Sequence, residues 1–94
     1  MHYEVVNGIQ TALRAEADHV YRWSNGPRFE YAAHSHPYRK ILYVQQGSIT
    51  FLPAGEVPIE LKAGDRLDLA PGAMHAAVVG DDGVVCWEGQ AKAR

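Results

Sequence analysis

The chain has 94 residues, one cysteine and a formal net charge of −2 at neutral pH. This length corresponds to one domain with a small core. A single cysteine excludes an intrachain disulfide, and the scattered basic residues do not resemble a nucleic-acid-binding surface. No apolar stretch approaches the roughly 20 residues of a membrane span, and the N-terminus lacks the apolar segment of a signal peptide. We therefore expect a cytoplasmic protein with no nucleic-acid and no membrane partner.

The chain begins with a helix signal and continues as short strands. Asn7 and Gln10 have the spacing of a helix capping box, and apolar residues at helical spacing follow, so we expect a helix over residues 8–17. From residue 20 onward, β-branched and aromatic residues alternate with clusters of Gly, Pro, Asn and Asp. The pattern predicts strands at 20–23, 28–36, 40–44, 48–52, 58–61, 66–69, 75–79 and 84–87, with turns at 45–47, 53–55 and 80–83 among others. Such regular short strands indicate an all-β sandwich or barrel.

Histidines occur in two short clusters that contain proline or glycine. Residues 34–37 read HSHP, and residues 71–75 read PGAMH. Side chains two positions apart on a strand point to the same face. His34 and His36 could therefore converge on one ion, and His75 could join them from a neighbouring strand. Three nitrogen ligands leave coordination positions open, as in catalytic metal sites. A pair of histidines at this spacing also occurs by chance on polar strands.

These motifs resemble those of the cupin superfamily. The two histidines of residues 34–36, the apolar run 41–44 and Gly47 look like the first cupin motif. Gly64-Asp65, Pro71-Gly72 and His75 look like the second. The resemblance covers residues 28–88. It implies an all-β double-stranded β-helix, or jelly-roll barrel, with a short N-terminal helix, a single cupin-like domain over 1–94 and a barrel core at about 20–88.

The resemblance also implies a metal site and an assembly. In cupins the corresponding histidines bind a divalent metal, which makes His34, His36 and His75 the implied ligands. Imidazole ligands suit several ions, so Zn, Fe, Ni, Mn and Cu all remain open. Cupins commonly dimerise, which implies a homodimer. Both faces of the predicted strand 41–44 are apolar, so one face needs the core and the other needs the helix or a partner.

Lys40 is the departure from the cupin pattern. The first motif usually has a glutamate ligand seven positions before its closing glycine, and here Lys40 stands seven before Gly47. A protonated lysine has no lone pair for a metal. At about 5 Å and an effective dielectric near 20, its ammonium would repel each unit of ionic charge by roughly 3 kcal/mol. Three outcomes are open: Lys40 turns to a carboxylate or to solvent, it stays uncharged in the pocket as a catalytic base, or the metal is absent.

Three functions are compatible with these residues. The first hypothesis is a metal-dependent enzyme that acts on a small anionic metabolite, because neutral imidazoles leave the ion's full charge and Lys40 adds to it. In that hypothesis Lys40 is the candidate catalytic residue. The alternatives are a non-catalytic small-molecule binding or sensor domain and a metal-free structural cupin. The cupin fold hosts all three, so the fold does not decide among them.

Overall fold

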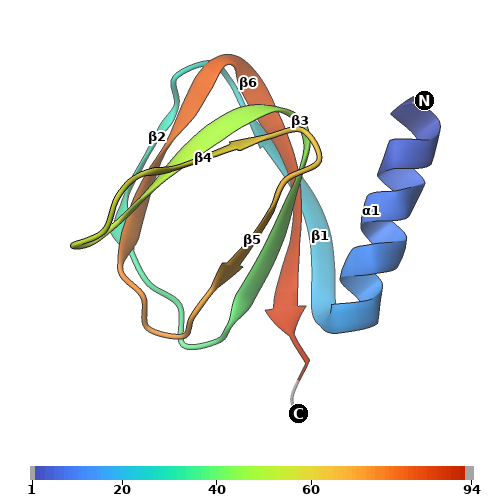
Figure 1. Cartoon of the computed structure of the whole chain (residues 1–94), viewed down its shortest axis with the longest axis horizontal. Helices are drawn as coiled ribbons and strands as arrows, with labels where there is room; N and C mark the ends of the chain where they lie inside the picture. Colours follow the sequence, from blue (N-terminus) through green and yellow to red (C-terminus); the bar gives the residue numbers. More distant parts are fainter. Residues whose placement is uncertain (1, 93–94) are drawn as a thin grey trace.

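The structure is a computed structural model that describes residues 2–92, without the side chains of residues 2–7. One helix precedes the strands, and Figure 1 shows the strands wrapped around a common interior with the helix outside. The elements are α1 (His2–Glu16), β1 (Ala17–Asn25), β2 (Glu30–His34), β3 (Lys40–Pro53), β4 (Ile59–Lys62), β5 (Arg66–Leu69) and β6 (His75–Ala91). No helix within the described residues has the length and apolar character needed to span a membrane.

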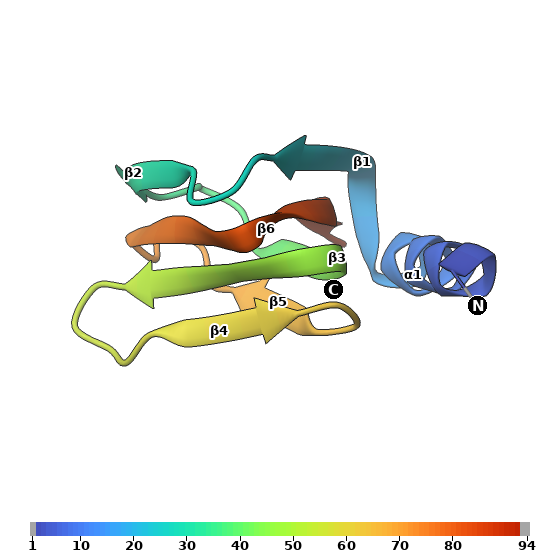
Figure 2. The same cartoon turned by 90° about the horizontal axis from the view of Figure 1, so that it is seen from above.

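Two long antiparallel strands, β3 and β6, build the barrel. They pair with each other from Lys40 to Pro53 of β3. The first half of β3 also pairs with β5 and its second half with β4, while β6 pairs with β2 through its first half and with β1 through its second. In the turned view, β1 and β2 lie on one side of this central pair and β4 and β5 lie on the other (Figure 2). The predicted all-β double-stranded β-helix is confirmed.

Two of the predicted turns are wrong, because β3 and β6 run through them without a break. The sequence predicted turns at 45–47 and 80–83, yet both ranges lie inside continuous strands. The register between β3 and β6 shifts twice around Gly47, as in β-bulges. Gly47 and Gly83 have φ angles of 78° and 79°. A Cβ on Gly47 would also collide with the backbone of Gly83. The glycines therefore allow β3 and β6 to bend where the two strands pair closely, and neither strand ends there.

The helix begins earlier than the sequence predicted. α1 starts at His2 and ends at Glu16, whereas the predicted range was 8–17. Asn7 therefore lies within the helix and is not its N-cap. No Gly or Pro occurs in residues 2–6 to stop the helix from extending toward the N-terminus. For the start of this helix, the capping-box spacing was thus a weaker signal than the absence of a helix-breaking residue in the segment before Asn7.

Helix α1 covers an apolar face on the outside of the barrel. Leu13 and Ala17 pack there against Ile41 of β3, with Val20, Tyr43, Trp87 and Ala91 partly buried around them. Glu16, the last residue of α1, accepts hydrogen bonds from Tyr43 at 2.7 Å and from Arg66 at 2.6 Å. The second apolar face predicted for residues 41–44 is therefore covered within the chain itself.

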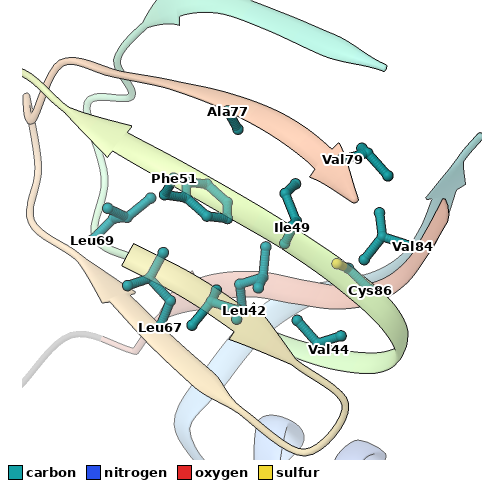
Figure 3. Packing of buried hydrophobic residues seen from close by; sticks show 11 residues of the cluster. Leu42, Val44, Ile49, Phe51, Leu67, Leu69, Ala77, Val79, Val84 and Cys86 are labelled. Carbon is teal, nitrogen blue, oxygen red and sulfur yellow. The ribbon is translucent and has the colours of Figure 1, made fainter. Parts of the chain in front are cut away.

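The main core fills the space between the walls of the barrel. Figure 3 shows these side chains converging from β3, β5 and β6. The buried members are Leu42, Val44, Ile49, Phe51, Leu61, Leu67, Leu69, Ala77, Val79, Val84 and Cys86. Aromatic side chains of β1 and β2, Trp23 and Tyr31, pack against this core and are only partly buried. The interior next to Trp23 and Tyr31 is not filled by side chains, and it forms a pocket.

Candidate metal centre

The structure brings together the three histidines that the sequence singled out. His34 ends β2 and His75 begins β6, and the two are register partners in the antiparallel pair. Their ring centroids are 4.6 Å apart. The ring of His36 lies 5.0 Å from that of His34 and 5.7 Å from that of His75. One ring nitrogen from each residue lies within 4.8 Å of the others. Strand pairing therefore places two imidazoles side by side, and the third completes the cluster.

His36 reaches this cluster from a loop and not from a strand. β2 ends at His34, so the strand alternation expected to align the two histidines of the first motif does not extend to His36. The backbone amide of Gly72 instead donates to the His36 carbonyl at 2.7 Å. This bond joins the loop after β2 to the turn that precedes His75. The two histidine segments are therefore held against each other by the backbone.

Backbone carbonyls orient two of the imidazoles. Nδ1 of His34 donates to the Ala32 carbonyl at 2.8 Å, and Nδ1 of His75 donates to the Ala73 carbonyl at 3.0 Å. A proton on Nδ1 leaves the lone pair on Nε2, which is the arrangement typical of a metal-ligating histidine. Nε2 of His36 and Nε2 of His75 are buried, and neither has a hydrogen-bond partner within residues 2–92. An unpartnered buried nitrogen is costly, and a bound metal ion would remove that cost.

Burial keeps two of the imidazoles neutral. Desolvation lowers the pKa of His36 and of His75 below the usual 6.5, and the charge of Lys40 lowers both further. Their lone pairs are therefore available at neutral pH. Three nitrogens bound to one ion at about 2.1 Å, at angles of about 90–120°, lie about 3.0–3.6 Å apart. Ring nitrogens that lie within 4.8 Å of one another therefore need to approach by about 1–2 Å at most. The donor set fits a divalent ion.

Lys40 lies inside the barrel, where it forms an ion pair with Glu88. Nζ is 3.2 Å from Oε1, and the two side chains are only 8% and 5% exposed. Of the three outcomes considered from the sequence, this geometry corresponds to the first, a lysine turned to a nearby carboxylate. The pair has no net charge, so its electrostatic repulsion of an ion at the histidines is far weaker than that of an unpaired ammonium.

Glu88 is the residue of this site that sequence reasoning missed. Besides contacting Lys40, it accepts hydrogen bonds from Tyr21 Oη and from Trp23 Nε1, each at 2.7 Å. In β6, Glu88 follows Val84 and Cys86 at alternate positions, and all of them are buried. That alternation was the available signal, since a carboxylate in an otherwise inward-facing apolar series requires an internal cation. The cation that meets it, Lys40, is far away in the sequence.

The histidine cluster and the Lys40–Glu88 pair line one pocket of about 260 Å³. Its remaining lining is mostly aromatic and apolar, and consists of Tyr21, Trp23, Asn25, Tyr31, Ile49, Phe51 and Ala77. The pocket is larger than the roughly 150 Å³ cavity that holds a benzene molecule and slightly smaller than typical drug-binding sites of about 300 Å³ upward. It can hold one small molecule with a polar group beside the histidines and an apolar part against the aromatic walls.

A double-stranded β-helix with histidines of two motifs facing its interior defines a small domain of the cupin superfamily. Comparison with known proteins agrees with this class. The model of the family described as AraC-like ligand binding domain matches residues 17–91, and the chain belongs to this family. No curated protein sequence matches the chain.

Several solved structures share the fold. The DMSP lyase DddQ from Ruegeria pomeroyi has a TM-score of 0.72 and 25% identity, over 78% of this chain and 37% of its own. A cupin-like protein from Thermotoga maritima has a TM-score of 0.70 and 27% identity, over 77% of this chain and 55% of its own. A protein from Klebsiella pneumoniae with a double-stranded β-helix domain has a TM-score of 0.67 and 28% identity, over 77% and 64%. This chain thus spans 37–64% of the length of these relatives.

Proposed function

We propose that this domain is a metal-dependent enzyme that binds a divalent ion through His34, His36 and His75 and acts on a small anionic metabolite. The observation that carries the proposal is the pair of buried, unpartnered Nε2 atoms of His36 and His75 in a cluster whose ring nitrogens lie within 4.8 Å. Three nitrogen ligands leave coordination positions open for substrate or water. Imidazole donors are compatible with Zn, Fe, Ni, Mn or Cu.

The charges around the pocket favour an anionic molecule. An imidazole that binds a metal ion carries no charge of its own, and the Lys40–Glu88 pair cancels its own charge, so the two positive charges of a divalent ion would remain uncompensated. An anionic group at the open positions would balance them. When bound, such an ion would polarise a carbonyl or carboxylate oxygen of the substrate or activate a water molecule.

The residues of the chain would contribute orientation and a hydrogen-bond donor. The carbonyls of Ala32 and Ala73 fix the imidazole planes of His34 and His75. Trp23, Tyr31 and Phe51 would exclude water from the apolar part of the substrate. Lys40 is the candidate catalytic residue in this proposal, because its ammonium lines the same pocket and would donate a hydrogen bond to negative charge that develops on the substrate.

A non-catalytic ligand-binding or sensor domain is the second candidate function. The match to the AraC-like ligand binding domain favours it. The two candidates share the pocket and the metal, and they differ only in whether the bound molecule is chemically changed. A ligand that binds the metal-loaded domain and is recovered unchanged would therefore support the second candidate.

Turnover by the metal-loaded chain tests the enzyme proposal. A panel of small carboxylates and oxo acids would be incubated with the chain before and after chelation, and products would be followed by NMR. We expect at least one compound to be consumed, with the activity lost after chelation and in the His75→Ala variant. His19→Asn is the matched control, because His19 is exposed and Asn tolerates its φ of 54°. If compounds bind and none is consumed, the enzyme proposal is contradicted.

We also propose that the domain forms a homodimer, as other cupins do. The face of β3 that carries Ile41 is covered by α1, so that face does not supply the interface. Other apolar side chains remain exposed, namely Phe29 at 46%, Leu52 at 40%, Val57 at 77% and Met74 at 48%. Contact with a second copy would remove part of this apolar surface from water.

A further inference from the structure

Lys40 and Glu88 form a buried ion pair that does not supply any metal ligand of the proposed site. The ammonium of Lys40 has three donor positions. Glu88 is the one carboxylate that pairs with it in the described part of the chain, through Oε1 at 3.2 Å. Both side chains line the pocket that contains the histidines. Donor positions of Lys40 therefore remain for a molecule in the pocket.

Glu88 is held in place by side chains of two other strands. Tyr21 and Trp23 of β1 donate to its two carboxylate oxygens at 2.7 Å, and Lys40 of β3 meets it from the other side. Glu88 itself belongs to β6 and is only 4% exposed. A carboxylate with this many partners has one orientation. Since Lys40 is paired with it, the position of the ammonium in the pocket is fixed as well.

The shape of the pocket limits what can meet this ammonium. Trp23, Tyr31 and Phe51 form aromatic walls, and Ile49 and Ala77 complete the apolar lining. The volume of about 260 Å³ leaves space for one body slightly larger than a benzene ring. Among the described residues that line the pocket, Lys40 is the one basic side chain other than the histidines. This described lining has no second cation to compensate another charge at the apolar end.

We propose that the Lys40 ammonium, positioned by Glu88, directly binds the carboxylate of a small monocarboxylate with a compact apolar body. The inference rests on the proposed function in one respect, since it names the class of anion that the same pocket takes. It assigns Lys40 as a ligand contact and Glu88 as a positioning residue. It also explains why a lysine is compatible with a pocket so close to a metal site.

Removal of the charge of Glu88 distinguishes two explanations. In one, Glu88 positions the Lys40 ammonium; in the other, its negative charge acts on the bound anion only through the electric field. Glu88→Gln removes a negative charge from the pocket, so a field effect alone would strengthen the binding of an anion. If Glu88 positions Lys40, the same variant weakens anion binding, because the ammonium loses its charged partner and shares the one remaining amide oxygen with the donors Tyr21 and Trp23. The two explanations thus predict opposite signs.

The test is a calorimetric titration of benzoate, of its uncharged analogue benzamide and of malonate into the metal-free chain at pH 8. The unchanged chain is expected to bind benzoate at least tenfold more tightly than benzamide, as a charge-assisted hydrogen bond would require. Lys40→Met and Glu88→Gln should each remove this preference for benzoate over benzamide. Glu60→Gln, which removes an exposed carboxylate on β4, is the charge-matched control and should retain the preference.

Several results would overturn the inference. One is a Glu88→Gln variant that binds benzoate as tightly as the unchanged chain or more tightly. Another is an unchanged chain that fails to prefer benzoate over benzamide, or that prefers malonate, an anion with two charges and no apolar body. If a single variant fails to fold, the double variant Lys40→Met/Glu88→Gln replaces it, because it leaves no unpaired buried charge. Retention of the preference by the double variant would equally exclude Lys40 as the contact.

The proposed metal function is tested separately, by titrating Zn²⁺ into the same samples. Zn²⁺ binding without a preference for benzoate would reject this inference and leave the metal site intact. A preference for benzoate in a chain that takes up no metal would support Lys40 as the contact and reject the metal-dependent enzyme.

Discussion

The imidazoles of this site are placed by contacts that the first motif alone does not specify. His34 and His75 meet because β2 and β6 pair in register, and His36 joins them through the Gly72 hydrogen bond. The cupin motifs were sufficient to nominate all three histidines from the sequence. They could not reveal Glu88, because the pairing of Glu88 with Lys40 depends on two strands that are distant in the sequence.

Lys40→Glu should tighten metal binding and destabilise the metal-free chain. The variant would place a second carboxylate beside Glu88, and two like charges in a buried site repel each other. A divalent ion would relieve that repulsion and gain a fourth ligand. Calorimetric titration of Zn²⁺ into both proteins measures the change, which we expect to be at least tenfold in affinity. Equal or weaker affinity would place position 40 outside the coordination shell of the metal.

Acid should destabilise the metal-free chain through the buried histidines. The pKa of His36 and of His75 is lowered in the folded state by desolvation, from 6.5. As the pH falls below about 6.5, the unfolded chain therefore binds protons that the folded chain does not, and the free energy of unfolding decreases. The contribution of the neutral histidines to stability is fully present above that pH. It decreases as the pH falls, until the pH reaches the lowered pKa of the folded chain. Urea unfolding of the chelated chain between pH 8 and pH 5 checks this, and a flat profile would contradict it.

At the scale of elements, glycine marks a turn at one position of this chain and a bulge within a continuous strand at others. Glycine at 47 and glycines at 80 and 83 were interpreted as turns, and the predicted turn at Gly55 contains the same residue type. Gly55 does lie in a turn, whereas Gly47 and Gly83 lie in bulges inside β3 and β6. A positive φ suits both situations. Only the antiparallel pairing of β3 with β6 decides between a turn and a bulge, and that pairing is a long-range contact.

Gly47→Ala should cost more stability than Gly55→Ala. Both positions have a positive φ, 78° and 76°, so the backbone strain of about 1–2 kcal/mol is common to the two variants. A Cβ at Gly47 meets the backbone of Gly83, whereas nothing lies within 4 Å of one at Gly55. Chemical denaturation of both variants gives the comparison. Equal losses of stability would show that the close approach of the two strands is not required.

At the scale of the whole molecule, the two cupin motifs predicted the barrel and the family match supports it. The alternation of apolar residues on both faces of residues 41–44 left a choice between a helix and a partner subunit. The structure shows that α1 covers that face. The composition of the chain could not decide between the helix and a partner subunit, because the answer depends on where the helix packs.

The proposed homodimer is tested on the whole molecule. Sedimentation velocity at tens of micromolar should give the mass of two chains. If the exposed apolar side chains form the interface, Val57→Ser or Met74→Ser should weaken the association. Arg22→Ser, an exposed substitution outside this apolar set, is the control. A monomer under these conditions would contradict the dimer and leave the proposed metal site unaffected.

The metal content of the chain, purified without a nickel column, tests the central claim most directly. Elemental analysis and native mass spectrometry should find about one divalent ion per chain, or uptake of one ion from a solution of Zn²⁺, Fe²⁺, Ni²⁺, Mn²⁺ or Cu²⁺. His36→Ala and His75→Ala should lower the affinity by similar factors, each at least the 10–100-fold that loss of an outer-shell partner costs. A chain that contains no metal and takes up none of these ions would contradict the account.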